Sequence, residues 1–471
     1  MFDQLRPRFF PQKLESKHGK CSYIALKHAS ASIILESLLF RAAPWQTDAT
    51  RMIRLAKRNS IAMGGARRLL FAALCAVPAG AQSVAEMAGE PTVKAAFEVI
   101  KRDEPALLAE QQRICEIAAP PFQEAARAAE FQKLFEGLGL NNVHIDKAGN
   151  VIGTRAGAKA HPNVALAAHL DTVFPAGTDV RVKRLGEVMR GPGIADDCRG
   201  LVVLLGVARA LNEAKITTSG TITFVADVGE EGLGDLHGMK ELFGEGHGID
   251  EFVSIDGTGA SLVNVGVGSY RYKVTFKGPG GHSYGNFGAA NPIQAMGRVI
   301  AKIDQFEVPE KPKTTFNVGR VGGGTSVNAI PFEAWMEVDL RSADVGQLNG
   351  LNEKFKVAVS EAVKEENERW HWRGAVSAVS ELVGMRPAGK TFDTEPLVRT
   401  ALAVNRFFGE SEGLSEASTD ANIPMSKGIP AITIGGGGMG SGAHSLNESY
   451  DARDSWKGTE RVLVLAVALT R

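Results

Sequence analysis

Residues 164–171 read Val-Ala-Leu-Ala-Ala-His-Leu-Asp, an apolar run followed at once by a histidine and, two positions later, by an aspartate. A short run that is apolar throughout is typical of a strand buried on both faces of a parallel sheet. In an open α/β sheet, ligands bind in the crevice at the carboxyl ends of the strands. His169 and Asp171 are therefore expected at a ligand-binding edge.

Three more apolar runs, at residues 221–226, 252–255 and 431–434, are followed by residues of the same kind. These residues are Glu230 and Glu231, then Asp256, and finally His444 beyond a run of glycines. Asp196 precedes a helix expected at residues 201–214 and so belongs to the same edge. Each residue alone has a plain structural explanation, such as a surface carboxylate, a turn or a loop tip. Their ordered recurrence after successive strands favours a shared site.

Two imidazoles and several carboxylates in one crevice repel one another unless cations lie among them. Nitrogen and oxygen ligands of this kind suit zinc, with cobalt or manganese as alternatives. Asp196 is placed to bridge two ions, because each carboxylate oxygen can bind one metal. The sequence therefore predicts a hydrolytic site with two Zn²⁺ ions, which in such sites lie about 3.5–4 Å apart.

In the middle of the chain the pattern changes from buried runs to strict alternation, as at residues 270–276 and 333–340. Alternation is typical of an antiparallel sheet with one face in water. We expect an α/β fold whose mostly parallel sheet has helices on both faces, interrupted by an inserted α+β, ferredoxin-like lid. The expected domains are a first catalytic part at residues 82–267, the lid at residues 268–376 and a second catalytic part at residues 377–471.

The 471 residues balance 53 Lys and Arg against 53 Asp and Glu, which removes any global case for a nucleic-acid binder. No apolar run reaches the roughly 20 residues needed to span a bilayer, so no stable membrane span is expected. Residues 63–81 have a basic start, a short apolar centre and a small-residue end, which is typical of a secretory signal peptide. Residues 1–62 are then a mis-assigned start or a disordered leader. We expect a periplasmic or secreted protein, with a cytoplasmic location as the alternative.

Six motifs occur in order along residues 160–450. They are HLDTV, GPGIADD, GEEG, IDGTG, GGHS and AHSLNE. This series resembles the dinuclear zinc metallopeptidases, the family of acetylornithine deacetylase, succinyl-diaminopimelate desuccinylase, glutamate carboxypeptidase and peptidase T, and most of all its peptidase T-like and tripeptidase-like members. The resemblance implies a catalytic α/β domain and an inserted lid through which two copies form a homodimer.

The resemblance also implies a ligand for each metal position. His169 and Asp256 would hold one zinc, Glu231 and His444 would hold the other, and Asp196 would bridge the pair. The zinc ions would lower the pKa of a water molecule and polarise the scissile carbonyl.

Catalytic and substrate-binding roles are implied in the same way. Asp171 would orient the imidazole of the metal-binding histidine two residues before it. Glu230 would be the general base, which takes a proton from the water and later returns one to the leaving amine. His282 would help to stabilise the tetrahedral oxyanion, often from the partner subunit. Asn328 and Arg341 match lid positions that bind a substrate carboxylate.

Two features depart from the family pattern. Many members have a lysine where this chain has Cys198, which weakens a direct transfer of deacetylase specificity. We expect Cys198 to be an inert side chain packed under the site, with a thiolate ligand as an alternative. Pairing of Cys198 with Cys115 in an oxidising periplasm has only weak support from the sequence. Asp256, where other members have glutamate, favours aminopeptidase-like and dipeptidase-like members.

The sequence thus predicts a dinuclear metal-dependent hydrolase of amide bonds. The first interpretation is a zinc exopeptidase that acts on small peptides. The alternative is an N-acyl-amino-acid deacylase of the same fold, which has the same reaction centre and differs only in substrate. A third interpretation, a non-catalytic binding module, is disfavoured because every ligand position is filled and Glu230 is present.

Overall fold

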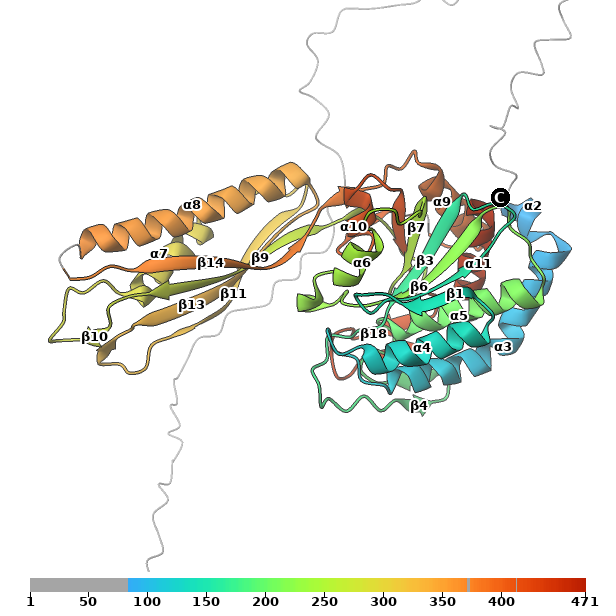
Figure 1. Cartoon of the computed structure of the whole chain (residues 1–471), viewed down its shortest axis with the longest axis horizontal. Coiled ribbons are helices and arrows are strands. Elements are labelled where there is room, and N and C mark those ends of the chain that lie inside the picture. The colour runs from blue at the N-terminus through green and yellow to red at the C-terminus, as the bar shows by residue number, and fades with distance from the viewer. Residues whose placement is uncertain (1–83, 371–372, 412) are drawn as a thin grey trace, which may run out of the picture. The chain divides into compact units, whose positions relative to one another are not determined.

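The computed structural model describes residues 84–370, 373–411 and 413–471, which Figure 1 draws in colour. The leader expected at residues 1–62 and the signal peptide expected at residues 63–81 lie outside the described residues. Among the described residues, no helix is both long enough and apolar enough to cross a membrane.

Within the described residues, a nine-stranded sheet has the order β1-β2-β6-β3-β7-β17-β8-β15, with β16 beside β8. The strands are β1 (Asn141–Ile145), β2 (Val151–Arg155), β3 (Asn163–His169), β6 (Thr221–Asp227), β7 (Glu251–Ile255), β8 (Leu262–Gly266), β15 (Gly389–Lys390), β16 (Ser415–Ala417) and β17 (Ala431–Ile434). The central strands β6, β3, β7 and β17 are parallel neighbours, whereas β2 and β8 pair with them in the antiparallel sense. The expected α/β fold with a mostly parallel sheet is confirmed.

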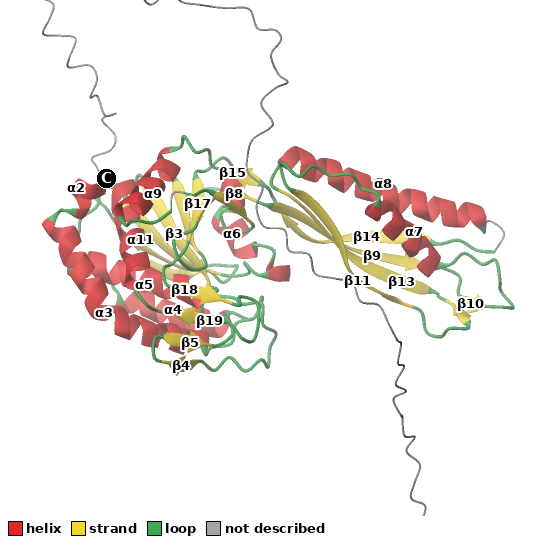
Figure 2. Ribbon diagram, turned by 180° about the vertical axis from the view of Figure 1, so that it is seen from behind, coloured by secondary structure: helices red, strands yellow, loops and turns green. Residues whose placement is uncertain are grey.

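Helices cover both faces of this sheet, as Figure 2 shows. Successive residues of β3 alternate between two hydrophobic clusters: Leu166 belongs to the larger cluster and Ala167 to the smaller one. The larger cluster includes α2 (Val84–Ala88), α3 (Pro91–Cys115), α4 (Ala125–Gly137), α5 (Cys198–Glu213), α9 (Pro396–Phe407) and α11 (Trp456–Leu469). The smaller cluster includes α6 (His237–Leu242) and α10 (Asn422–Ser426). Burial on both faces explains why these strands are apolar throughout.

The segment expected to form a lid, called the lid below, contains a four-stranded antiparallel sheet in the order β11-β13-β9-β14, with two helices on one face (Figure 2). Its elements are β9 (Gly268–Lys277), α7 (Pro292–Asp304), β11 (Thr314–Gly323), β13 (Glu333–Ser342), α8 (Val345–Arg369) and β14 (Ser377–Arg386). The boundary expected at residue 376 was wrong, because β14 pairs with β9 along its whole length. The side chains of β14 are mostly exposed, so its sequence lacks a clear alternating signal.

Two smaller sheets complete the fold of the described residues. One has the order β18-β19-β5-β4, formed by β4 (Lys183–Leu185), β5 (Val188–Arg190), β18 (Met439–Ser441) and β19 (Ser449–Asp451). The other pairs β10 (Gly281–His282) with β12 (Ala329–Ile330) in the lid. The first sheet places the segment before α5 beside the segment between β18 and β19.

A disulfide bond joins Cys115 at the end of α3 to Cys198 at the start of α5. Cys198 is buried and paired, so the alternative of a thiolate ligand was wrong, and the pairing with Cys115 that had only weak support from the sequence is present. The two cysteines are separated by 83 positions in the sequence, but α3 packs against α5 in the larger hydrophobic cluster. The bond holds the first turn of α5 directly after Asp196 and Asp197.

Replacing both Cys115 and Cys198 with serine is expected to lower the free energy of unfolding by about 2–5 kcal/mol, because the bond closes a long loop in the unfolded chain. Urea unfolding of the wild type and the variant, each with and without reductant, measures this change. Reductant should lower the midpoint of the wild type and leave that of the variant unchanged. Equal midpoints for both proteins without reductant would contradict the prediction.

Candidate active site

The candidate metal ligands lie at the carboxyl ends of neighbouring parallel strands. His169 is the last residue of β3, and Asp256 directly follows β7. Glu230 and Glu231 lie in the segment that follows β6. Because β6, β3 and β7 are parallel neighbours, their ends bring these residues to one edge of the sheet.

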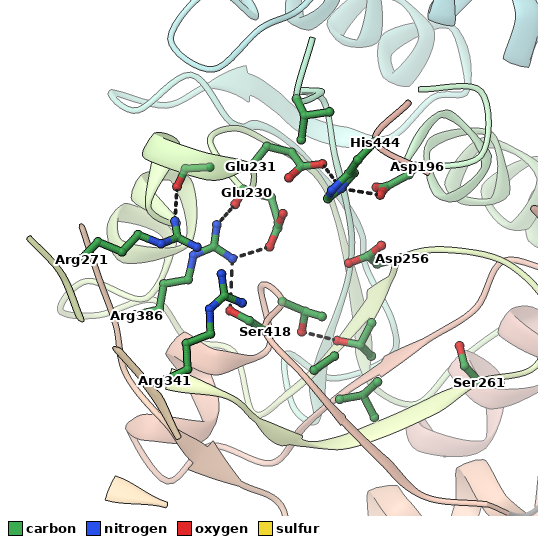
Figure 3. A pocket seen from close by; sticks show the side chains of 16 residues that line it. Asp196, Glu230, Glu231, Asp256, Ser261, Arg271, Arg341, Arg386, Ser418 and His444 are labelled. Carbon is green, nitrogen blue, oxygen red and sulfur yellow. Dashed lines mark hydrogen bonds and ion pairs between the residues drawn. The ribbon is translucent and has the colours of Figure 1, made fainter. Parts of the chain in front are cut away.

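Asp196 lies between the two histidines. One oxygen of its carboxylate is 3.1 Å from Nε2 of His169, and the other is 3.2 Å from Nε2 of His444. Nε2 of His444 also lies 3.0 Å from Oε1 of Glu231. Figure 3 marks this contact with a dashed line. Two sets of possible ligand atoms, each within 4.8 Å of one another, share Asp196: one adds His169 and Asp256, and the other adds Glu231 and His444. This grouping suits two adjacent metal ions bridged by one carboxylate.

The electrostatics of the cluster favour bound cations. Burial first, and then the neighbouring Asp196 carboxylate, raise the pKa of Asp256 to about 7. Burial also raises the pKa of Asp197 and of Glu230 well above the usual ranges of their carboxyl groups. Raised pKa values of this kind mean that the negatively charged form of these carboxyl groups is unfavourable in the crevice. Divalent cations would relieve that opposition, and the donor set of imidazole nitrogens and carboxylate oxygens suits zinc and similar metals.

Asp171 supports the site in two ways. Its carboxylate accepts hydrogen bonds from the backbone N–H of Glu230 at 3.0 Å and of Glu231 at 2.8 Å. Its backbone carbonyl is 3.0 Å from Nδ1 of His169, whereas its carboxylate is 3.6 Å from the same atom. When Nδ1 of His169 donates a hydrogen bond to this carbonyl, Nε2 remains free to face Asp196. Asp171 therefore fixes the imidazole through its backbone and the two glutamates through its side chain.

Glu448 fixes the segment that carries Asp196. Its buried carboxylate accepts hydrogen bonds from the backbone N–H of Gly193 at 3.0 Å, of Ala195 at 2.8 Å and of Asp196 at 3.0 Å. It lies four residues after His444, so one carboxylate ties the two ligand segments together. The peptide bond between Asp196 and Asp197 is cis.

Three arginines of the lid line a pocket of about 530 Å³ together with the candidate ligands. They are Arg271, Arg341 and Arg386, all labelled in Figure 3. The register places Arg341 and Arg386 on either side of Ser269 in adjacent strands, with Arg271 two residues further along β9. All three therefore share the face of the lid sheet that α7 and α8 leave uncovered.

Arg341 and Arg271 share one carboxylate. Nε of Arg341 is 2.6 Å from Oδ2 of Asp339, and Nε of Arg271 is 3.3 Å from Oδ1. Two guanidinium groups thus face a single Asp339 carboxylate, so positive charge is in excess on this side of the pocket. Arg386 instead donates to the Glu230 carboxylate, with 2.9 Å between Nη1 and Oε1.

His282 and Asn328 lie together, away from this pocket. They belong to the two-stranded sheet of β10 and β12 or border it, and Ser283 N–H donates to the carbonyl of Asn328 at 2.9 Å. This sheet follows the end of β9, whereas Arg271 lies near its start. Both side chains are exposed, and neither lines the pocket of its own chain.

No role was predicted from the sequence for three residues that contact the site: Arg271, Arg386 and Glu448. Glu448 stands inside the quoted AHSLNE motif, so its position was visible although its role was not. The two arginines are ordinary strand residues in the sequence, and the pairing of β14 with β9 places Arg386 near Arg271.

The sequence model of peptidase family M20/M25/M40 matches residues 165–468. Carboxypeptidase G2 of Pseudomonas sp. (strain RS-16) is 26% identical over 376 residues, which are 75% of this chain and 86% of that protein. Aminopeptidase PepT of Bacillus cereus has a similar structure, with a TM-score of 0.65 and 22% identity, covering 78% of this chain and 99% of that one. A tripeptidase of Staphylococcus aureus gives a TM-score of 0.64 at 25% identity, covering 78% and 98%.

Replacing Glu448 with glutamine is expected to weaken zinc binding about 10- to 100-fold, because residues that orient metal ligands typically contribute that much. The amide keeps the size of the side chain but loses the charge that three N–H groups surround. Titration of zinc against a competing chelator measures the change. Asp451→Asn is the matched control, since that carboxylate pairs with the exposed Arg453. Unchanged affinity in Glu448→Gln would remove the role assigned to this residue.

Proposed function

Because the chain belongs to peptidase family M20/M25/M40, we propose that this hydrolase is a zinc-dependent exopeptidase that cleaves small peptides. One observation carries the proposal: the two oxygens of Asp196 face two different imidazoles, with Glu231 and Asp256 alongside. Deacylation of N-acyl amino acids is the alternative, because the same residues would perform it.

The residues divide into metal ligands and a proton carrier. When bound, two divalent cations would polarise the scissile carbonyl and lower the pKa of a water molecule. Asp196 would bridge them, with His169 and Asp256 on one side and with Glu231 and His444 on the other. Glu230 would accept a proton from the attacking water and later donate one to the leaving amine. A carboxylate oxygen of Glu230 lies within 4.8 Å of atoms of His169 and Glu231, which supports this role.

The side of the pocket lined by arginines suits a substrate with a free carboxylate. Arg341 lines the pocket and shares Asp339 with Arg271, so its guanidinium can turn a donor edge to a carboxylate. Small peptides and N-acyl amino acids both carry such a group. Similarity in sequence to a carboxypeptidase supports release of a C-terminal residue, whereas similarity in fold to an aminopeptidase favours attack at the other end. The similarity to a tripeptidase supports a short peptide as the substrate.

Two further proposals concern the compartment in which the protein works and its oligomeric state. The disulfide between Cys115 and Cys198 supports an oxidising compartment, as expected for an exported protein. His282 does not line the pocket of its own chain, which supports a homodimer in which a second copy supplies this residue through its lid.

Replacing Glu230 with glutamine is expected to lower kcat about 10²- to 10⁴-fold while two metal ions remain bound. Metal analysis and hydrolysis of a panel of dipeptides, tripeptides and N-acyl amino acids, for wild type and variant, provide the measurements. Cleavage confined to N-acyl amino acids would favour the deacylase. A wild type that binds metal and cleaves no amide would refute the proposed function, and an active variant would refute the role of Glu230.

Mixing two inactive variants tests the dimer. His282→Ala leaves the base intact, and Glu230→Gln leaves His282 intact, so a mixed dimer would contain one complete site. Co-expression of both variants is expected to restore up to about a quarter of wild-type activity, the statistical share of complete sites when subunits mix freely. Light scattering of the wild type gives the oligomeric state. Absence of any recovery in a demonstrated mixed dimer would refute transfer of His282 between subunits.

A further inference from the structure

Arg386 is a buried cation at the junction of the lid and the catalytic part. It is the last residue of β14, the strand that returns the chain from the lid to the catalytic part, and its side chain is 4% exposed. It lines the same pocket as the candidate metal ligands, as Figure 3 shows. A cation buried to this degree needs defined partners.

Glu230 provides two of the hydrogen-bond acceptors for Arg386. Nη1 of Arg386 donates to Oε1 of Glu230 at 2.9 Å and to the Ser418 hydroxyl at 3.2 Å. Nη2 donates to the backbone carbonyl of Glu230. The guanidinium fork therefore holds the side chain and the backbone of one residue together. This double contact restricts the rotation of the Glu230 carboxylate about its side-chain bonds.

The orientation that results is useful for catalysis. Oε1 of Glu230 is held by Arg386, and a carboxylate oxygen of the same residue lies within 4.8 Å of ligand atoms of His169 and Glu231. A general base must lie within hydrogen-bond reach of the proton that it accepts. The contact with Arg386 holds the Glu230 carboxylate beside the ligand cluster, which provides that geometry.

The same end of the lid also holds the segment that follows Glu230. The backbone N–H of Met385 donates to Asp235 at 2.7 Å, and Lys240 donates to the Met385 carbonyl at 3.1 Å. Nη1 of Arg271 donates to the carbonyl of Gly232 at 2.6 Å. Strands β9 and β14 thus both contact the segment that carries Glu230, so a movement of the lid base would also move this carboxylate.

We propose that Arg386 is a positioning residue, which fixes the Glu230 carboxylate for proton transfer and makes its orientation depend on the lid. This inference rests on the proposed function. It assigns Arg386 a different task from Arg341, whose guanidinium shares Asp339 and is proposed to bind the carboxylate of the substrate.

The test separates these two tasks by their kinetics. Arg386→Met and Arg341→Met are compared on one peptide with a free C-terminal carboxylate and on the same peptide as its amide. Arg386→Met is expected to lower kcat about 100-fold on both substrates, the effect of misplacing a reacting group by about 1 Å. Its KM should stay within about threefold of the wild type. Arg341→Met should raise KM on the free carboxylate and have little effect on the amide.

Further variants exclude a general loss of structure. Arg386→Lys keeps the charge but not the fork, and it should recover at least part of the lost kcat, which also covers the case in which Arg386→Met does not fold. Arg113→Met, which removes a surface arginine paired with Glu110 and Glu130, is the matched control. Metal content and urea unfolding are measured for each variant.

Each outcome decides one question. Unchanged kcat in a folded Arg386→Met, or a rise in KM restricted to the free carboxylate, would overturn the positioning role. A loss of kcat in Arg386→Lys as large as in Arg386→Met, together with loss of metal, would also overturn it. A wild type inactive on both peptides and on the substrate panel would refute the proposed function instead.

Discussion

Several carboxylates buried in one crevice repel one another, and this repulsion is the constraint on which the rest of the structure depends. A buried charge is stable only when it is paired or hydrogen-bonded. Four of these acidic groups have such partners. Asp171 and Glu448 accept backbone N–H groups, Glu230 pairs with Arg386, and the two oxygens of Asp196 face two imidazoles. The raised pKa of Asp256 indicates that the carboxylates of the crevice still have too few positive groups near them. Metal ions would supply that charge.

Two sheets cooperate to hold this cluster. The large sheet supplies the residues at the ends of β3, β6 and β7. The small sheet supplies the other two ligands, because β5 and β19 pair directly, with Arg190 opposite Ser449. The segment with Asp196 leaves β5, and the segment with His444 enters β19 through Glu448. Backbone pairing therefore sets the approximate distance between these ligands, and the Glu448 carboxylate sets it more finely.

The sequence predicted the parts of the site that depend on local pattern. Each residue from His169 to Asp256 follows a buried strand or precedes a helix, so the continuous apolar runs and their order were enough to place it at one edge. Strand β14, the disulfide and Arg386 depend instead on which distant segments pair, and no local signal marks them. Strand β14 is mostly exposed, so its apolar pattern is weak. Cys115 and Cys198 meet because α3 packs on α5, which becomes visible only in the folded chain.

The pairing of β9 with β14 also has a consequence for the history of the fold. The chain enters the lid at Gly268 and leaves it at Arg386, and Ser269 lies directly opposite Arg386 in the register. Entry and exit are therefore adjacent, and a short turn could join them without displacing any strand of the large sheet. An insertion of this form can be gained, lost or exchanged as a unit. Evolution can thus change what the pocket recognises while leaving the metal ligands where they are.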